Sequence, residues 1–178
     1  MSTYDRLIEL LDRGQARFRL IDHAPEGRTG PASVLRSHAA AQAAKCLVVR
    51  VALGRRSRRY VLAVVPGDRR VDLDGLNDLY SGRETSFASR EAAERLTGSV
   101  SGSIPPFAFH ADLDLVVDPT LLVHEEIFFN AARLDRSVAL ATSDYLTLAG
   151  PLVQRIAEPP PEVLTTAAAS GAHGDDAA

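Results

Sequence analysis

The stretch Ala43-Ala44-Lys45-Cys46-Leu47-Val48-Val49-Arg50-Val51 combines an apolar run typical of a buried strand with a lysine at its start. Lys45 is the only lysine among the 20 basic residues of the chain. A lysine at a strand edge often has no function, because its stem covers apolar surface while its head stays in water. Arginine presents a rigid planar fork, whereas lysine is a compact charge whose pKa changes when it loses water. The exclusive use of arginine elsewhere therefore makes Lys45 a candidate functional residue.

The pattern of apolar runs predicts an α+β domain with one mixed, strongly curved and barrel-like sheet flanked by helices. Residues 46–53 and 60–65 are joined by a glycine and polar residues, which predicts a β-hairpin. A helix is predicted over 31–43, with Arg36 on its exposed face. Further helices are expected after Ser2 or Thr3, after Ser89 and after Thr142 or Ser143. The remaining predicted strands cover 18–21, 85–88, 113–117, 126–130, 137–141 and 152–157.

Length and composition indicate a single domain, since 178 residues of which 46% are hydrophobic can bury a full core. No apolar run approaches the roughly 20 residues that span a bilayer, so no membrane partner is expected. The single cysteine cannot form an internal disulfide, and this favours a cytoplasmic location. The histidines lack metal-ligand spacing, and neither common Gly-rich phosphate loop occurs. We therefore expect no metal and no cofactor.

The charge distribution separates the body of the chain from its end. The net charge of −3 argues against a bulk nucleic-acid binder. Residues 158–178 hold four of the 23 acidic residues and none of the basic ones, so the remainder has 19 acidic against 20 basic residues. Local contact with nucleic acid therefore stays open. The Pro-, Ala- and Gly-rich composition predicts that 158–178 is a disordered tail after a domain of residues 1–157.

The loop over 97–109 is the second candidate for chemistry. Gly98 and Gly102 permit close approach of the backbone to a ligand, while Pro105 and Pro106 stiffen the far end. Such a loop can present backbone N–H groups to a carbonyl that becomes an oxyanion. The alternative interpretation is a wide structural connection.

Other reactive side chains have plausible structural explanations. Strand alternation places Cys46 on the face opposite Lys45, so we interpret Cys46 as a packing residue. His23 follows Asp22 at a strand end and is either half of an acid/base pair or a hydrogen-bonded structural residue. The arginines of the predicted hairpin tip form either a solvated turn or a phosphate contact: Arg55, Arg56, Arg58 and Arg59.

Four motifs in this order resemble the YbaK/ProX family of bacterial aminoacyl-tRNA deacylases, which are related to the editing domain of prolyl-tRNA synthetase. They are the Ala-Lys-x-Leu-Val start of the strand, the Val-Pro-Gly-Asp turn at 65–68, the G-x-x-x-P loop, and Ser137 followed by Asp144. The resemblance covers Tyr4 to about Ala157. It is greatest to the YeaK-type branch, which shares the opening Arg-Leu-Ile-x-Leu-Leu helix, the Ile-Pro-Pro-Phe-x-Phe-His loop and the Phe-Asn-Ala-x-x-Leu-Asp-x-Ser run. That branch is associated with editing of seryl- and threonyl-tRNA.

The resemblance implies roles for individual residues. Lys45 matches the essential lysine, which holds the 3′ end of the substrate or its reacting ester. Gly102 and Pro106 match the loop that approaches the aminoacyl group, with Ser103 and Ile104 between them. Ser137 and Asp144 match positions that line the pocket, where a carboxylate could hold the α-ammonium, and we add His23 as a substrate-binding candidate. Cys46 departs from the pattern, because many relatives have Asn or Thr after the lysine.

The function predicted on this basis is a free-standing hydrolase that removes the wrong amino acid from mischarged tRNA, with seryl- and threonyl-tRNA as substrates. An activated ester needs no strong nucleophile, so a positioned water, an oxyanion site and the 2′-hydroxyl of the substrate could suffice. One alternative is the same chemistry on alanyl or cysteinyl esters of the proline tRNA. Another is a non-catalytic module that binds tRNA or a synthetase. Aminoacyl-tRNA is the expected partner, and a synthetase partner is left open.

Overall fold

The computed structural model describes residues 1–160, so most of the predicted tail, residues 161–178, lies outside the described part of the chain. Its helices are α1 (Thr3–Arg13), α2 (Thr29–Leu35), α3 (Leu73–Leu79), α4 (Arg90–Thr97) and α5 (Thr142–Ala149). Ser2 caps α1 and Ser89 caps α4, as their sequences predict. No helix in residues 1–160 is long and apolar enough to cross a membrane.

The strands form two sheets, which confirms the α+β class and the mixed strand directions. The larger sheet has the order β4-β2-β3-β5-β8 and the smaller one β1-β7-β6. A single bridge between Ala43 and Phe128 connects them, and within residues 1–160 no barrel closes. The bounds are β1 (Phe18–Asp22), β2 (Ala44–Ala52), β3 (Arg58–Pro66), β4 (Glu84–Phe87), β5 (Leu113–Val117), β6 (Glu126–Asn130), β7 (Arg136–Ala141) and β8 (Leu152–Val153).

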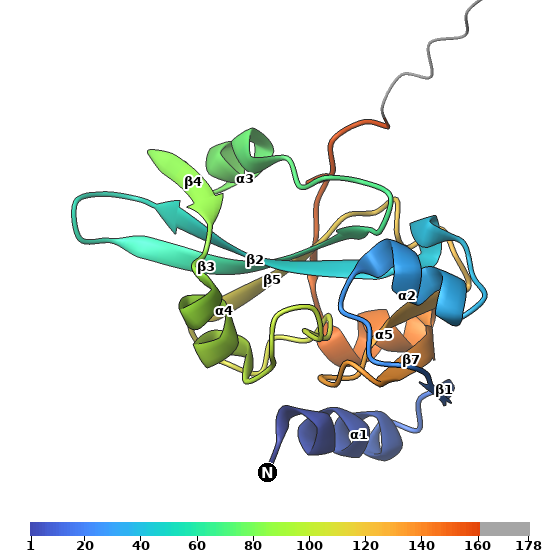
Figure 1. The fold of residues 1–178 in the computed structure, drawn as a ribbon. Coiled ribbons are helices and arrows are strands. Elements are labelled where there is room, and N and C mark those ends of the chain that lie inside the picture. The colour runs from blue at the N-terminus through green and yellow to red at the C-terminus, as the bar shows by residue number, and fades with distance from the viewer. Residues whose placement is uncertain (161–178) are drawn as a thin grey trace, which may run out of the picture.

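The β2–β3 hairpin runs through the middle of the molecule, with α3 on one face and α4 on the other (Figure 1). Val48 and Leu62 belong to the core cluster on the α4 side, and Val49 and Val61 to the cluster on the α3 side. Both faces of the hairpin are therefore buried, which explains its nearly continuous apolar sequence. Consecutive residues of β2 point to opposite cores, and this alternation decides what Lys45 and Cys46 can reach.

Two predicted elements are shorter than their sequences indicated. The helix predicted over 31–43 ends at Leu35, because Ser37 takes a left-handed conformation with φ of 57°, and a 3₁₀ turn at Ala40–Gln42 follows. The strand predicted over 152–157 covers only Leu152–Val153. Its continuation leaves the sheet because Asp118 accepts hydrogen bonds from the backbone N–H groups of Ile156 and Ala157, at 2.8 and 2.7 Å.

Asp118 ties the end of β5 to the C-terminal segment from a fully buried position. Burial alone would raise the pKa of Asp118, but hydrogen bonds from Thr120, Ile156 and Ala157 outweigh it and lower the pKa. Because the pKa is lower in the folded state, the contribution of the carboxylate is fully present above its unfolded pKa of about 3.9 and is lost as pH falls through the folded value.

We expect Asp118→Asn to lower the free energy of unfolding by about 1–3 kcal/mol. The side-chain NH₂ group of asparagine is a donor, and it would face the N–H groups of Ile156 and Ala157 that now donate to the Asp118 carboxylate. Urea unfolding at neutral pH measures the change. Asp12→Asn, on the exposed surface of α1, is the control and should change stability by less than about 0.5 kcal/mol. Equal effects of the two substitutions would show that Asp118 does not anchor the C-terminal segment.

Candidate active site

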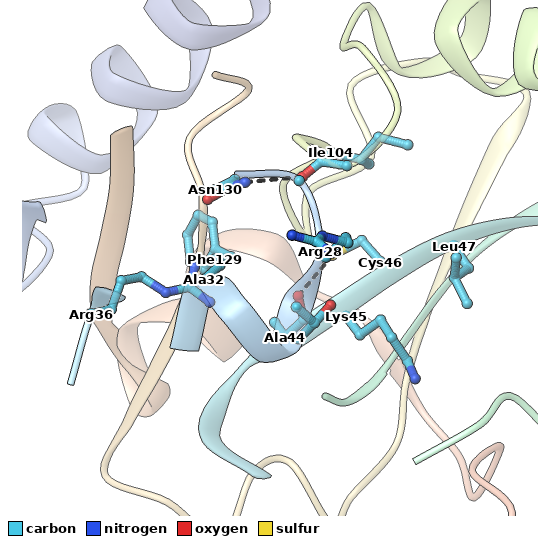
Figure 2. Close-up of a pocket in the computed structure, with 13 residues that line it drawn as sticks. Arg28, Ala32, Arg36, Ala44, Lys45, Cys46, Leu47, Ile104, Phe129 and Asn130 are labelled. Carbon is cyan, nitrogen blue, oxygen red and sulfur yellow. Dashed lines mark hydrogen bonds between the residues drawn. The ribbon is translucent and has the colours of Figure 1, made fainter. Parts of the chain in front are cut away.

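A cavity of about 270 Å³ lies beside the start of β2, between α2 and the loop that follows α4. Figure 2 shows the side chains around it, which come from segments far apart in the sequence. The lining residues that matter for the chemistry are Gly27, Arg28, Arg36, Lys45, Cys46, Gly102, Ile104 and Asn130. The predicted loop and the predicted strand therefore meet at one hollow.

Two glycines make one wall of the cavity by direct contact between their loops. Gly102 has a φ of 91°, in the left-handed region that favours glycine. A Cβ atom on Gly102 would lie 2.8 Å from Cα and 2.9 Å from the carbonyl oxygen of Gly27. Any other residue at position 102 would therefore force the loops apart.

Asn130, at the end of β6, holds these two loops together. Its Nδ2 donates to the carbonyl oxygens of Glu26 and Gly102, at 2.8 and 2.9 Å. Its Oδ1 accepts a hydrogen bond of 2.8 Å from the hydroxyl of Ser137 on β7. All hydrogen-bonding groups of the Asn130 amide are thus engaged, so its orientation in the cavity wall is fixed.

Ser137 and His23, both predicted to bind substrate, lie together behind this wall. Ser137 is fully buried, and its Oγ is 2.7 Å from His23 Nε2. His23 Nδ1 lies 2.8 Å from the carbonyl oxygen of Ala24. Neither residue lines the cavity. In this structure they support Asn130.

Arg36 is 7% exposed, which corrects the prediction that it lies on the solvent face of its helix. Its Nη1 donates to Ser137 Oγ at 3.2 Å, whereas its buried Nε has no hydrogen-bond partner in residues 1–160. Burial lowers the pKa of Arg36 to about 10, so the guanidinium stays charged at neutral pH. A charged group with an unused donor therefore lies at the cavity.

Lys45 directs its side chain to the opposite face of β2, away from Asn130 and Ile104 (Figure 2). Its Nζ donates to the carbonyl oxygen of Arg69. Burial lowers the pKa of Lys45, Asp68 partly offsets this effect, and Arg70 adds to it. The ammonium borders a second cavity of about 610 Å³, which Arg70, Asp74 and Phe87 also line. Because Lys45 lines both cavities, it stands at their junction.

Cys46 faces the first cavity, on the side of β2 opposite the Lys45 head, as alternation predicted. Its thiol lies 3.5 Å from the carbonyl oxygen of Ala44. Burial raises the pKa of the Cys46 thiol, which keeps it protonated at neutral pH. These properties suit a packing residue and not a nucleophile.

Of the remaining residues of the predicted loop, some line the cavity and others stabilise the loop itself. Ile104 lines the cavity. Ser103 is buried and bonds the carbonyl oxygen of Val100 at 2.9 Å, and Pro106 is buried beside Phe107. The loop is also tied to α4, since Ser101 N–H donates to Glu94 Oε1 at 2.9 Å. The cavity is therefore bordered by a braced loop.

The structure does not bring Asp144 to this cavity. Asp144 lies in the first turn of α5, where it accepts hydrogen bonds from the backbone N–H and Nε of Arg17, at 2.8 and 3.0 Å. The cavity lining contains no carboxylate, and Arg36 is its only basic residue with an unpaired head at the cavity, because Lys45 points to the opposite face of β2 and Arg28 pairs with Glu26 at 2.9 Å. Its charge thus suits a group that is, or becomes, negative.

Sequence reasoning missed Arg36, Asn130 and Gly27. Asn130 lies within the Phe-Asn-Ala run that resembles the YeaK-type branch, so the motif contained a usable signal. Gly27 lies in a Gly- and Pro-containing loop whose partner loop is distant in sequence. Arg36 carried no signal, because an arginine in an Ala-rich helix is ordinarily exposed.

The fold and the loop-bounded cavity define a protein of the aminoacyl-tRNA editing class: the aminoacyl-tRNA editing domain family matches residues 32–148, and the chain belongs to that family. The chain is 43% identical over 150 residues to the multifunctional Ser/Thr-tRNA deacylase ProXp-y of Escherichia coli (strain K12). The match covers 84% of this chain and 89% of that protein. The predicted family is thereby confirmed.

Solved structures share the fold. A putative trans-editing enzyme for prolyl tRNA synthetase superposes with a TM-score of 0.73 at 22% identity, covering 89% of this chain and 99% of the other. The hypothetical protein APE2540 gives a TM-score of 0.76 at 22% identity, with 86% and 99% covered. At this identity the likeness establishes the editing-domain fold alone.

We expect Gly102→Ala to lower the free energy of unfolding by about 1–3 kcal/mol. Alanine is strained at the positive φ of this position, and its Cβ atom would push Gly27 away. Gly54→Ala is the matched control, since a Cβ at Gly54 meets nothing within 4 Å. The control should stay within about 0.5 kcal/mol of the parent in chemical denaturation. A Gly102→Ala protein as stable as the control would contradict the close approach of the two loops.

Proposed function

We propose that this protein is a trans-editing hydrolase that cleaves the ester between a wrong amino acid and the 3′ end of a tRNA, with seryl- and threonyl-tRNA as its substrates. Membership of the editing family supports the reaction, and the 43% identity to a Ser/Thr-tRNA deacylase supports the choice of amino acids. The observation that carries the proposal is the small cavity that the Gly102 loop (residues 97–109) closes, with the buried and unpaired guanidinium of Arg36 in its lining.

The chemistry requires only that the cavity position an ester and stabilise an oxyanion. Water adds to the carbonyl carbon, and the carbonyl oxygen becomes negative in the transition state. Cationic side chains and fixed N–H groups favour that state over the neutral ester. Arg36 is suited to this role, because it is charged, buried and without a carboxylate partner among residues 1–160.

A serine-nucleophile mechanism is less well supported, although Ser137 and His23 have the hydrogen-bond distance of such a pair. A nucleophile must reach the ester carbon, and Ser137 is fully buried behind Asn130. Attack by water, helped by the 2′-hydroxyl of the substrate, fits the arrangement better.

The two cavities suggest how a substrate would divide between them. The 270 Å³ cavity suits a small aminoacyl group, and the 610 Å³ cavity on the Lys45 side has room for part of the terminal nucleoside. Lys45 at the junction would then contact the ribose or phosphate of the 3′ end. This placement agrees with the role that the family resemblance implies for Lys45.

The proposed partner is aminoacyl-tRNA, and recruitment by a synthetase is a further proposal based on the trans-editing structural neighbour. A synthetase pocket discriminates between amino acids that differ by one methylene group by only about 1–3 kcal/mol, so some tRNA receives the wrong amino acid and a separate editing site is needed. Since tRNA is charged and used in the cytoplasm, that is the location we propose.

We expect Lys45→Ala to lower kcat/KM for seryl-tRNA by about 100-fold or more while the protein stays folded, because an electrostatic contact to the substrate is lost. Lys45→Arg should fail too, since a planar fork cannot replace an ammonium. Deacylation rates and thermal melts provide the test, with Arg13→Ala on the exposed surface of α1 as control. Parental rates in Lys45→Ala would remove Lys45 from the mechanism.

We expect kcat/KM to favour seryl and threonyl esters over alanyl and cysteinyl esters on one tRNA body. A site that hydrogen-bonds a hydroxyl can reject an analogue without it by roughly 10⁴-fold, because its own polar groups are left unpaired. Faster hydrolysis of alanyl or cysteinyl esters would support the alternative substrates. Tight tRNA binding without hydrolysis of any ester would support a binding module.

A further inference from the structure

The beginning of β2 has a free edge that faces the candidate site. β2 pairs with β3 from Ala44 to Ala52 but with β4 only from Val49 to Ala52. The chain leaves β4 at Phe87, and Ser89 already caps α4. Apart from the bridge between Ala43 and Phe128 of β6, the backbone of β2 before Val48 therefore has a neighbouring strand on one side only.

The direction of the Cys46 peptide groups follows from the ladder. In an antiparallel pair, residues alternate between those that bond the partner strand and those that face away from it. Ala44 pairs with Pro66, which has no N–H, and the carbonyl oxygen of Val64, opposite Cys46, accepts from Asp118 instead, at 2.9 Å. The N–H and C=O groups of Cys46 therefore point away from β3.

The other edge of β2 gives the same result. The carbonyl oxygen of Val48 accepts a hydrogen bond of 2.9 Å from the N–H of Ala88, so the even-numbered residues of β2 face the β4 side. Cys46 lies two residues before Val48 in β2, and residue 90 would lie opposite it if β4 continued as a strand. The chain at 90 is already in α4, so that strand position is vacant.

The vacant position opens onto the site. The 270 Å³ cavity and a neighbouring one of about 240 Å³ share Cys46 and Leu47 on one wall and Gly102 and Ile104 on the other. A ligand between these walls lies between the free edge of β2 and the Gly102 loop.

We infer that the aminoacyl group binds as a one-residue extension of β4 along this edge. The Cys46 N–H donates to the ester carbonyl oxygen, and the Cys46 carbonyl oxygen accepts from the α-amino group. An aminoacyl ester carries an amine and a carbonyl on one carbon, as a residue of a strand does, so both contacts match its chemistry. This inference rests on the proposed function and names how that site holds its substrate.

The Cys46 N–H then serves the reaction directly. When water adds to the carbonyl carbon, the electron pair of the C=O bond moves onto the oxygen that this N–H bonds. Collapse restores the C=O bond and breaks the bond to the ribose oxygen, which takes up the proton lost by the water. The products are a free amino acid and a tRNA with both terminal hydroxyls.

The test compares Cys46→Pro with Cys46→Ala, which both lack the thiol and differ in the N–H. Because this N–H makes no bond to β3, proline should be tolerated, as on an edge strand. We expect melting temperatures within a few degrees of each other and a kcat for seryl-tRNA about 100-fold or more lower in Cys46→Pro. A folded Cys46→Pro protein within tenfold of Cys46→Ala would overturn the inference.

If Cys46→Pro does not fold, a second variant carries the α-hydroxy counterpart of alanine at position 46, so that an ester oxygen replaces only the N–H. We again expect a kcat for seryl-tRNA about 100-fold or more below that of Cys46→Ala, and a value within tenfold would overturn the inference. A parental protein that hydrolyses no aminoacyl-tRNA would instead refute the proposed function.

The contact between the α-amino group and the Cys46 carbonyl oxygen is tested with 3-hydroxypropanoyl-tRNA, which is seryl-tRNA without its amino group. Hydrolysis as fast as that of seryl-tRNA would exclude the contact to the Cys46 carbonyl.

Discussion

The hydrogen bonds of Asn130 to the carbonyl oxygens of Glu26 and Gly102 hold the site in shape. They join two loops that are distant in the sequence and bring Gly27 and Gly102 into backbone contact. Ser137 fixes the amide from behind, and His23 and Arg36 both bond Ser137. A polar network behind the wall thus determines the shape of an otherwise small and partly apolar cavity.

The electrostatics of the cavity follow from what its walls lack. A buried guanidinium is costly when no carboxylate compensates it, and Arg36 has none among residues 1–160. Such a cost is offset when a neighbouring group acquires negative charge. Hydrolysis of an ester creates that charge only in the transition state, so the unpaired cation favours reaction over simple binding.

Sequence alone predicted the strands well and the side-chain network poorly. The hairpin, β5 and β6 follow from long apolar runs between turn residues, and these signals are local. The helix over 31–43 was predicted too long, because the helix propensity of alanine gives no warning of the left-handed Ser37. The YbaK/ProX motifs led to the family and to the strand and loop that meet at the cavity.

The arrangement within the site depends on tertiary contacts that no local pattern encodes. His23 and Ser137 are 114 positions apart, and their contact requires β1 to pair with β7. Asp144 matched a motif by spacing, yet its carboxylate bonds Arg17. The vacancy beside Cys46 likewise exists only because α4 begins where β4 would have continued.

The proposed reaction requires that the aminoacyl group lie between the start of β2 and the Gly102 loop. The most direct measurement is a crystal structure with 3′-(L-seryl)amino-3′-deoxyadenosine, whose amide bond resists hydrolysis. We expect the seryl group in the cavity between Cys46 and Gly102, with the nucleoside towards Lys45. Binding at another surface, with this cavity unchanged, would contradict it.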